Sequence, residues 1–274
     1  MHNMAQTETK NMALFCDFEN VALGVQEAKY AQFDIRKVLE RLLLKGSIVV
    51  KKAYCDWARY KDFKAPMHEA AFELIEIPHV RQSGKNSADI RMVVDALDLC
   101  YTKAHVDTFV IISGDSDFSP LVSKLRENNK LVIGVGVKKS TSDLLMANCD
   151  EFIYYDDLVR EEETKKRTAK KSAAKPKAAP KNESGESTDE EDRKQEAIDL
   201  VLETIEALAA ERAGEPIWGS MIKPAIKRRK PGFTESYYGF KSFGQLLEEA
   251  KTRKLIELQR DEKSNNYIVR TSTG

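Results

Sequence analysis

Thr108-Phe-Val-Ile-Ile-Ser-Gly-Asp115-Ser-Asp117-Phe118 is the most informative stretch of this 274-residue chain. Its first five residues are β-branched or aromatic and show no polar alternation, which predicts a strand buried on both faces. The Ser-Gly turn that follows ends the strand. Asp115 and Asp117 therefore stand at its carboxyl end.

Other parts of the first 158 residues alternate between short apolar runs and longer amphipathic stretches. Further strands are expected at Met12–Cys16, Ser47–Tyr54, Lys130–Val137 and Phe152–Tyr155. Helical spacing is found over Phe33–Leu44, Pro66–Ile75, Ala88–Cys100, Pro120–Asn128 and Ser142–Cys149. This alternation predicts an α/β fold, a parallel sheet with flanking helices. Ligands of such sheets bind beyond the carboxyl ends of the strands.

Aspartates occupy that edge in three separate segments. Asp17 follows the first strand, Asp115 and Asp117 follow the central strand, and Asp89 begins the helix before it. Crowded carboxylates repel one another, and a bound divalent cation relieves the repulsion. Oxygen ligands favour Mg²⁺ or Mn²⁺, which suits phosphodiester cleavage. The alternative for each aspartate is a helix cap or a turn residue.

Several other function classes lose support. The turn after the first strand is not Gly-x-Gly-x-x-Gly, and the chain has neither a P-loop nor a Gly-x-Ser-x-Gly elbow. The four cysteines lie far apart, which is typical of buried free thiols. The apolar runs are far shorter than the roughly 20 residues of a membrane span, and the N-terminus lacks a secretory pattern. We therefore expect a cytoplasmic protein without a membrane partner.

Three motifs of the first half carry a family resemblance. Leu14-Phe-Cys-Asp17-Phe-Glu-Asn20, Lys85-x-x-x-Asp89 leading into Asp95-Ala-Leu, and Ile112-Ser-Gly-Asp-Ser-Asp-Phe-Ser-Pro-Leu-Val122 resemble the NYN domain of the LabA-like group. This group is related to PIN-domain ribonucleases. The resemblance covers about residues 11–158 and implies a PIN-like (Rossmannoid) sheet in a domain over 1–158. It also implies a site that cleaves RNA with Mg²⁺ or Mn²⁺.

The resemblance assigns roles to particular residues. Asp17, Asp89, Asp115 and Asp117 match the acidic positions and are the expected catalytic and metal-binding residues. Asn20 and Asp95 are expected to support the site.

Three residues near these motifs are candidates for RNA contact. Trp57 and Arg59 follow the second strand and suit base stacking and phosphate contact. Lys85 precedes the acidic helix. The alternatives are core packing for Trp57 and an ordinary exposed lysine for Lys85.

Charge is distributed unevenly although the formal net charge is zero. It is −3 over residues 1–157, +6 over 160–181, −6 over 182–192 and +5 over 215–260. The segment 159–193 has almost no large apolar residues, so it is predicted to be a flexible linker. A basic module tied to a mildly acidic one indicates a polyanionic partner.

Residues 194–270 show a periodicity of their own. Helices are expected at Ala197–Leu208, Ile217–Ile226 and Phe243–Ala250, followed by strands at Leu255–Leu258 and Tyr267–Val269. This order is typical of a winged-helix α+β domain. Pro216-Ile-x-Gly-Ser-x-Ile-Lys-Pro and Gly239-Phe-Lys-Ser-Phe-Gly-Gln-Leu-Leu resemble the LOTUS (OST-HTH) domain. That resemblance implies binding of RNA or of a protein partner.

Basic and aromatic residues of this domain are the candidate RNA contacts. They are Lys223, Lys227, Arg228, Arg229, Lys230, Tyr238 and Lys241. The alternative is a solvated basic face. Together the two halves predict a metal-dependent ribonuclease whose RNA is recruited by the C-terminal domain. The rival hypotheses are a non-catalytic RNA-binding regulator with a vestigial acidic site and a scaffold whose C-terminal domain recruits protein, and the sequence leaves a homo-oligomer open.

Overall fold

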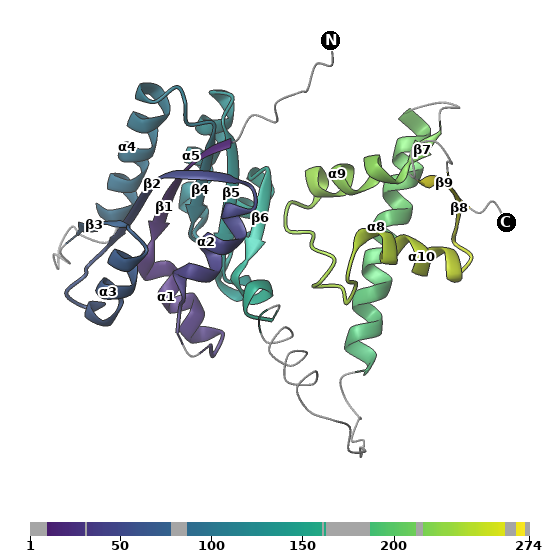
Figure 1. Cartoon of the computed structure of the whole chain (residues 1–274), viewed down its shortest axis with the longest axis horizontal. Coiled ribbons are helices and arrows are strands. Elements are labelled where there is room, and N and C mark those ends of the chain that lie inside the picture. Colours follow the sequence, from purple (N-terminus) through teal and green to yellow (C-terminus); the bar gives the residue numbers. More distant parts are fainter. Residues whose placement is uncertain are drawn as a thin grey trace, which may run out of the picture. The chain divides into compact units, whose positions relative to one another are not determined.

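The computed structural model describes residues 10–30, 32–77, 87–160, 162, 187–211, 216–260 and 267–271. The chain divides into two compact units, Met1–Arg160 and Glu161–Gly274 (Figure 1). Each unit buries its own set of apolar side chains. Among the described residues, no helix has the length and apolar character that crossing a membrane requires.

The first unit is built on a sheet of six parallel strands in the order β3-β2-β1-β4-β5-β6. The strands are β1 (Lys10–Asp17), β2 (Gly46–Cys55), β3 (Glu73–Glu76), β4 (Thr108–Ile112), β5 (Leu131–Gly136) and β6 (Glu151–Tyr154). The predicted α/β fold is therefore confirmed. Because β1 and β4 are neighbours in register, with Cys16 opposite Ile112, their carboxyl ends meet.

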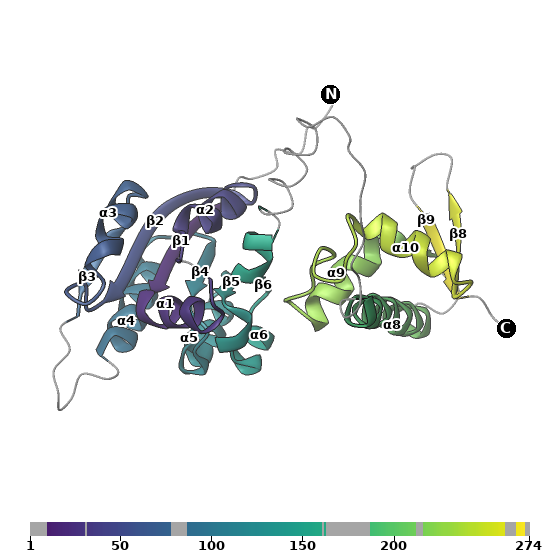
Figure 2. The ribbon, with the colours of Figure 1, turned by 90° about the horizontal axis from the view of Figure 1, so that it is seen from below.

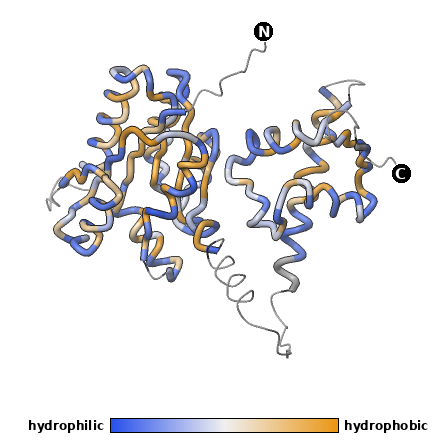
Figure 3. Tube along the Cα trace, in the orientation of Figure 1, coloured by the Kyte–Doolittle hydropathy of each residue, from blue (hydrophilic) through white to orange (hydrophobic). Residues whose placement is uncertain are grey.

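Helices cover both faces of this sheet. They are α1 (Phe18–Glu27), α2 (Ile35–Leu43), α3 (Lys61–Glu69), α4 (Ser87–Thr102), α5 (Ser119–Glu127) and α6 (Asp143–Asn148). Figure 2 shows α4, α5 and α6 together on one side. In β1, Leu14 packs with α1 to α3 and Phe15 packs with α4 to α6. Burial on both faces explains why the central strands β4 and β5 are continuously apolar, as Figure 3 shows.

The predicted helix over Pro66–Ile75 is wrong in its second half. Helix α3 ends at Glu69, and Ala71 then adopts a left-handed conformation with φ of 58°. A non-glycine residue in that region cannot continue a helix. The chain instead enters β3, which pairs with β2 at the edge of the sheet. Helix α1, which follows β1 directly, is an element that the sequence patterns did not predict.

The second unit is a small α+β assembly, as expected. Its helices are α8 (Ser187–Glu211), α9 (Gly219–Arg229) and α10 (Phe243–Thr252), and its antiparallel strands are β7 (Ile217–Trp218), β8 (Ile256–Arg260) and β9 (Tyr267–Thr271), in the order β7-β9-β8. The helix expected from Ile217 thus begins two residues later, after a short strand. Helix α8 begins at Ser187, inside the segment 159–193.

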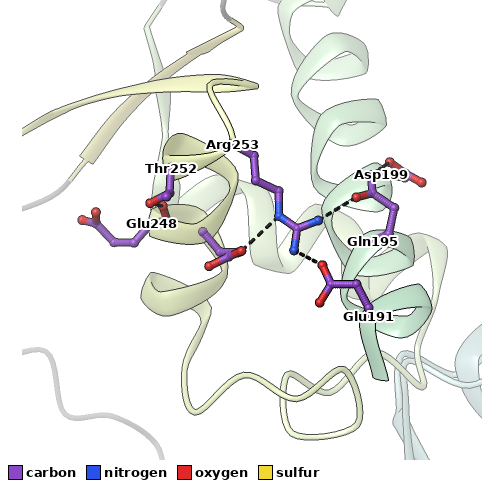
Figure 4. A network of polar contacts seen from close by, with 7 residues as sticks. Glu191, Gln195, Asp199, Glu248, Thr252 and Arg253 are labelled. Atoms are coloured by element: carbon purple, nitrogen blue, oxygen red, sulfur yellow. Dashed lines mark hydrogen bonds and ion pairs between the residues drawn. The ribbon is translucent and has the colours of Figure 1, made fainter. Parts of the chain in front are cut away.

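Arg253 fixes α10 against α8 (Figure 4). Its Nη1 donates to Gln195 Oε1 at 2.9 Å and its Nη2 donates to Glu191 Oε1, both on α8. Its Nε donates to Glu249 Oε1 at 3.0 Å within α10. The planar guanidinium therefore joins two helices through three acceptors.

Candidate active site

Asp17 stands where β1 turns directly into α1. It is the N-cap of that helix, and its Oδ1 accepts a hydrogen bond from the Asn20 N–H at 3.4 Å. Its Oδ2 accepts from the Ser113 hydroxyl at 2.9 Å. Only 7% of Asp17 is exposed. The capping alternative is therefore true of Asp17, and the same carboxylate also lies at the carboxyl end of the sheet.

The loop after β4 is tied to this position. Ser113 Oγ accepts from the Asp115 N–H at 3.2 Å, and Asn20 Oδ1 accepts from the Gly114 N–H at 2.8 Å. A Cβ at Gly114 would lie 2.3 Å from the Ser140 carbonyl oxygen, so only glycine fits there. Asp115 Oδ1 accepts from the Asp117 N–H at 3.0 Å and caps the 3₁₀ turn Ser116–Phe118. These bonds fix the ends of β1 and β4 relative to each other.

A cavity of about 310 Å³ opens at this edge of the sheet. Five carboxylates line it: Asp17, Glu19, Asp56, Asp89 and Asp115. Asn20 and Cys55 are also in its wall. The described residues of the wall include no lysine, arginine or histidine. The cavity is therefore strongly acidic, and we call it the acidic cavity.

Burial and repulsion by neighbouring carboxylates change the titration of Asp17 and Asp89. The pKa of Asp17 is raised from 3.8 to about 7, chiefly by burial and also by the charges of Asp89 and Asp115, against the opposing effect of its hydrogen bonds from Ser113 and Asn20. Burial also raises the pKa of Asp89, aided by Asp115, Asp117 and Glu19. Asp17 and Asp89 therefore both lie within the field of other carboxylates at this edge of the sheet.

Three of the four predicted acidic residues, Asp17, Asp89 and Asp115, line the acidic cavity. Asp117 is exposed and outside its wall, although close enough to raise the pKa of Asp89. Sequence reasoning missed Glu19 and Asp56. A signal for both existed, because Glu19 lies in the first turn after β1 and Asp56 immediately follows β2.

Asp95 does not belong to this site. Its Oδ2 accepts from the Tyr54 hydroxyl at 2.9 Å and lies 3.4 Å from Lys52 Nζ, while its Oδ1 accepts from Arg91 Nε at 3.1 Å. It joins α4 to β2 and is not among the described residues of the cavity wall. Asn20, in contrast, lines the cavity as expected of a supporting residue.

The predicted RNA contacts of the first unit have different surroundings. Trp57 is 1% exposed, packs on Phe18 at 5.0 Å between ring centroids and donates its indole N–H to the Ile75 carbonyl. It therefore belongs to the core and offers no free face to a base. Arg59 is half exposed and pairs with Glu19 at 3.1 Å, beside the acidic cavity. Lys85 lies outside the described residues.

The basic residues of the second unit are partly neutralised within it. Lys223 pairs with Glu235, Arg229 lies 3.5 Å from Glu203, and Lys230 lies 3.6 Å from Glu196. Tyr238 is buried and stacks on Phe233, so its ring is a core element and not a stacking platform. Lys227 is half buried, whereas Arg228 and Lys241 are exposed.

The side chains that line the acidic cavity are suitable ligands for a hard divalent cation. Carboxylate oxygens are the ligands that Mg²⁺ and Mn²⁺ prefer, and the wall supplies five carboxylates, of which Glu19 pairs with Arg59 beside the cavity. Within the described parts of the chain, however, no three His, Cys, Asp or Glu side chains converge into a ready-made metal cage. The residue types fit such an ion, which would have to draw the carboxylates closer together.

Comparison with known proteins assigns the first unit. A family profile described as the NYN domain matches residues 11–156. The chain belongs to the NYN domain family. NYN domains form part of the PIN-like nuclease superfamily, and the six-stranded parallel sheet agrees with that membership.

Two relatives of this NYN protein illustrate the extent of the similarity. An uncharacterized protein of Methanocaldococcus jannaschii is 29% identical over 143 residues, which are 51% of this chain and 56% of the relative. The chain thus spans little more than half of that relative's length. A solved structure of a Vibrio parahaemolyticus protein of unknown function superposes with a TM-score of 0.50 at 27% identity, covering 57% of this chain and 98% of that one. Neither name states a substrate.

Proposed function

We propose that this NYN protein is a metal-dependent ribonuclease whose RNA is recruited by its C-terminal unit, a LOTUS-like winged helix. The observation that carries the proposal is the acidic cavity, where Asp17, Asp89 and Asp115 meet at the carboxyl edge of a nuclease-family sheet. Parallel sheets bind their ligands at this edge.

In this proposal Asp17, Asp89 and Asp115 hold Mg²⁺ or Mn²⁺, with Glu19 and Asp56 within the same wall. The chemistry that such an ion supplies when bound is charge stabilisation at the phosphoryl group and a lowered pKa for water. Ser113 keeps the carboxylate of Asp17 in place through its 2.9 Å bond. Asn20 uses its Oδ1 to hold the Gly114 N–H, which leaves its amide N–H groups for a phosphate oxygen.

Two residues beside the cavity have further roles in this proposal. Asp117 is exposed next to Asp89 and adds negative charge at the entrance. Arg59 is held by Glu19 at the same edge. In this proposal its guanidinium contacts the RNA backbone.

The test is cleavage of labelled single-stranded and structured RNA with Mn²⁺, with Mg²⁺ and with EDTA. We expect cleavage by the wild type that EDTA abolishes and that Asp115→Asn reduces by about 100-fold or more, since each ligand of a cluster acts with the others. Asp143→Asn is the matched control, because Asp143 is an exposed aspartate in the first turn of α6, outside the cavity wall. Retained RNA binding without metal-dependent cleavage would support a non-catalytic RNA-binding protein instead.

A further inference from the structure

A cavity of about 610 Å³ lies beside the end of α10 in the second unit. Its wall combines basic and apolar side chains: Lys251, Lys254, Arg270, Ile256, Leu258 and Ile268, with Glu257 and Gln259. Three cations against one carboxylate give the wall a net positive charge. We call it the basic cavity.

The end of α9 carries a second group of cations, Lys227, Arg228, Arg229 and Lys230, which we call the α9 basic run. The cations of the basic cavity differ from them in their ion pairs. Arg229 and Lys230 are close to glutamates of α8. Within the part of the chain that the structure describes, Lys251, Lys254 and Arg270 form no ion pair. Their charge is therefore available to an anionic ligand, whereas the α9 run has part of its charge already compensated.

The neighbouring sheet face adds an aromatic side chain. Ile217 and Val269 point into the core, so the alternation of strand residues places Trp218 and Ile268 on the other face. Trp218 pairs with Ile268 across β7 and β9, and Ile268 lines the basic cavity. Trp218 is half-buried, and cations beside an aromatic with an accessible face are the combination that binds single-stranded nucleic acid.

We propose that the basic cavity binds the backbone of single-stranded RNA, with Trp218 beside it as a stacking surface for a base. This inference rests on the proposed function and gives it a definite RNA site in the second unit. Lys251, Lys254 and Arg270 contact phosphates, and the apolar wall accepts a sugar or a base.

The test compares two triple variants of the full chain in EDTA, by fluorescence anisotropy with labelled single-stranded RNA over a range of KCl. Lys251→Gln/Lys254→Gln/Arg270→Gln should weaken binding about tenfold or more and lower the salt slope by about 2, because each phosphate contact on a single strand contributes about 0.7. Arg228→Gln/Arg229→Gln/Lys230→Gln removes the same charge and should have a clearly smaller effect. Circular dichroism melting checks that both variants fold.

Equal losses in the two variants, a loss in the α9 variant alone or salt-independent binding would overturn the inference. These outcomes are separate from the nuclease test. Metal-dependent cleavage that depends on Asp115 can persist when the basic cavity proves irrelevant, and the reverse also holds. A second readout is the fluorescence of Trp218 in a Trp57→Phe chain, since the sequence contains two tryptophans. RNA should quench it.

An independent observation concerns α4 in the first unit. Ile90, Val94 and Tyr101 are 63%, 56% and 65% exposed, and Leu97 lies between them, half buried. The spacing of four, three and four residues places all four on one side of the helix, as in the seam of a coiled coil. We call these residues the α4 stripe.

The charges beside the α4 stripe are self-complementary. Arg91 and Asp98 lie on the same flank of the stripe by the helical period. The Nε of Arg91 pairs with Asp95 of its own helix at 3.1 Å, which leaves its Nη1 and Nη2 groups for a second partner. In an antiparallel pair of identical helices related by a two-fold axis, this flank meets itself with its direction reversed, so that Arg91 approaches Asp98 of the second copy. In a parallel pair, the flank with Arg91 and Asp98 would instead face Val93 and Cys100 of the second copy, which carry no charge. We propose that the α4 stripe binds the α4 stripe of a second copy, giving an antiparallel homodimer.

Sedimentation velocity at high micromolar concentration tests this second inference. The wild type should be a dimer, and Val94→Glu should be monomeric because a carboxylate cannot be desolvated in the seam. Leu44→Glu is the matched control, since Leu44 is 81% exposed but lies outside α4. Asp98→Arg should weaken the dimer, and Arg91→Asp in the same chain should restore it. A monomeric wild type, or equal behaviour of the two glutamate variants, would show that the stripe is covered by something else or by nothing.

Discussion

Asp17 illustrates how one residue serves both fold and proposed function. It caps α1 and accepts the Ser113 hydroxyl, yet it is buried beside other carboxylates. Burial favours the protonated form, whereas binding of a cation needs the ionised form. In the metal-free protein the ionised Asp17 is therefore a source of instability, which a bound cation would remove.

This conflict predicts a pH dependence for the metal-free protein. The folded-state pKa of about 7 lies above the ordinary value of 3.8, so the folded protein holds a proton that the unfolded chain has released. The free energy of unfolding should then fall as pH rises between these values. In the Asp17→Asn protein this decline should be smaller. Its free energy of unfolding should exceed that of the wild type by about 2 to 4 kcal/mol near pH 8 and differ little from it near pH 4. Urea denaturation in EDTA measures both.

Asp143→Asn controls for the loss of a carboxylate as such, because Asp143 is exposed at the start of α6. Its difference from the wild type should not change with pH over this window. An Asp17→Asn protein whose stability declines with pH as steeply as the wild type would contradict the raised pKa of Asp17.

Ser113 is a second residue whose removal has a definite cost. Its buried hydroxyl donates to Asp17 and accepts from the Asp115 N–H. Ser113→Ala leaves both groups without this partner and should lower the free energy of unfolding by about 1 to 3 kcal/mol. Ser123→Ala, at an exposed position on α5, should change it by less than about 0.5 kcal/mol. Equal effects in urea denaturation would show that the Ser113 bonds do not stabilise the loop.

At the scale of elements, the buried parallel strands were predictable because each reads as a short apolar run. The boundary between α3 and β3 was not, since Leu74 and Ile75 continue the apolar spacing of a helix while the left-handed Ala71 interrupts the chain. Asp17 and Asp115 could be placed from strand ends, and Asp89 from the start of the helix that precedes β4. Burial could not: core packing stood only as one alternative for Trp57, the buried Tyr238 was a candidate RNA contact, and Glu19 and Asp56 were overlooked.

The contact between α8 and α10 gives a prediction at the same scale. Arg253 reaches Gln195 and Glu191 on α8 through two different nitrogens (Figure 4). Arg253→Lys keeps the charge but loses the planar fork, so it should destabilise the second unit by about 1 kcal/mol, a modest loss because these groups are partly exposed. Thermal unfolding of the full chain measures it. Arg228→Lys, on the exposed side of α9, should have no measurable effect.

For the whole molecule, the two proposed RNA sites carry opposite charge. Five carboxylates line the acidic cavity, and a polyanion is repelled from it until cations are bound. The basic cavity of the second unit has no such barrier. Under the proposed function, electrostatics divides the roles: the second unit would supply most of the affinity for RNA, and tethering would raise the local concentration of RNA at the NYN domain.

This division predicts that affinity depends on RNA length. With Mn²⁺ present and RNA whose linkages resist hydrolysis, RNA long enough to reach both sites should bind the wild-type chain about tenfold tighter than short RNA, whereas in EDTA RNA should engage only the basic cavity. This gain in affinity for long RNA should vanish in the Lys251→Gln/Lys254→Gln/Arg270→Gln chain, because only one of the two RNA sites then remains. Anisotropy titrations with a ladder of single-stranded RNA lengths measure the gain. An affinity that rises with length equally in both chains would mean that the two units do not act on one RNA together.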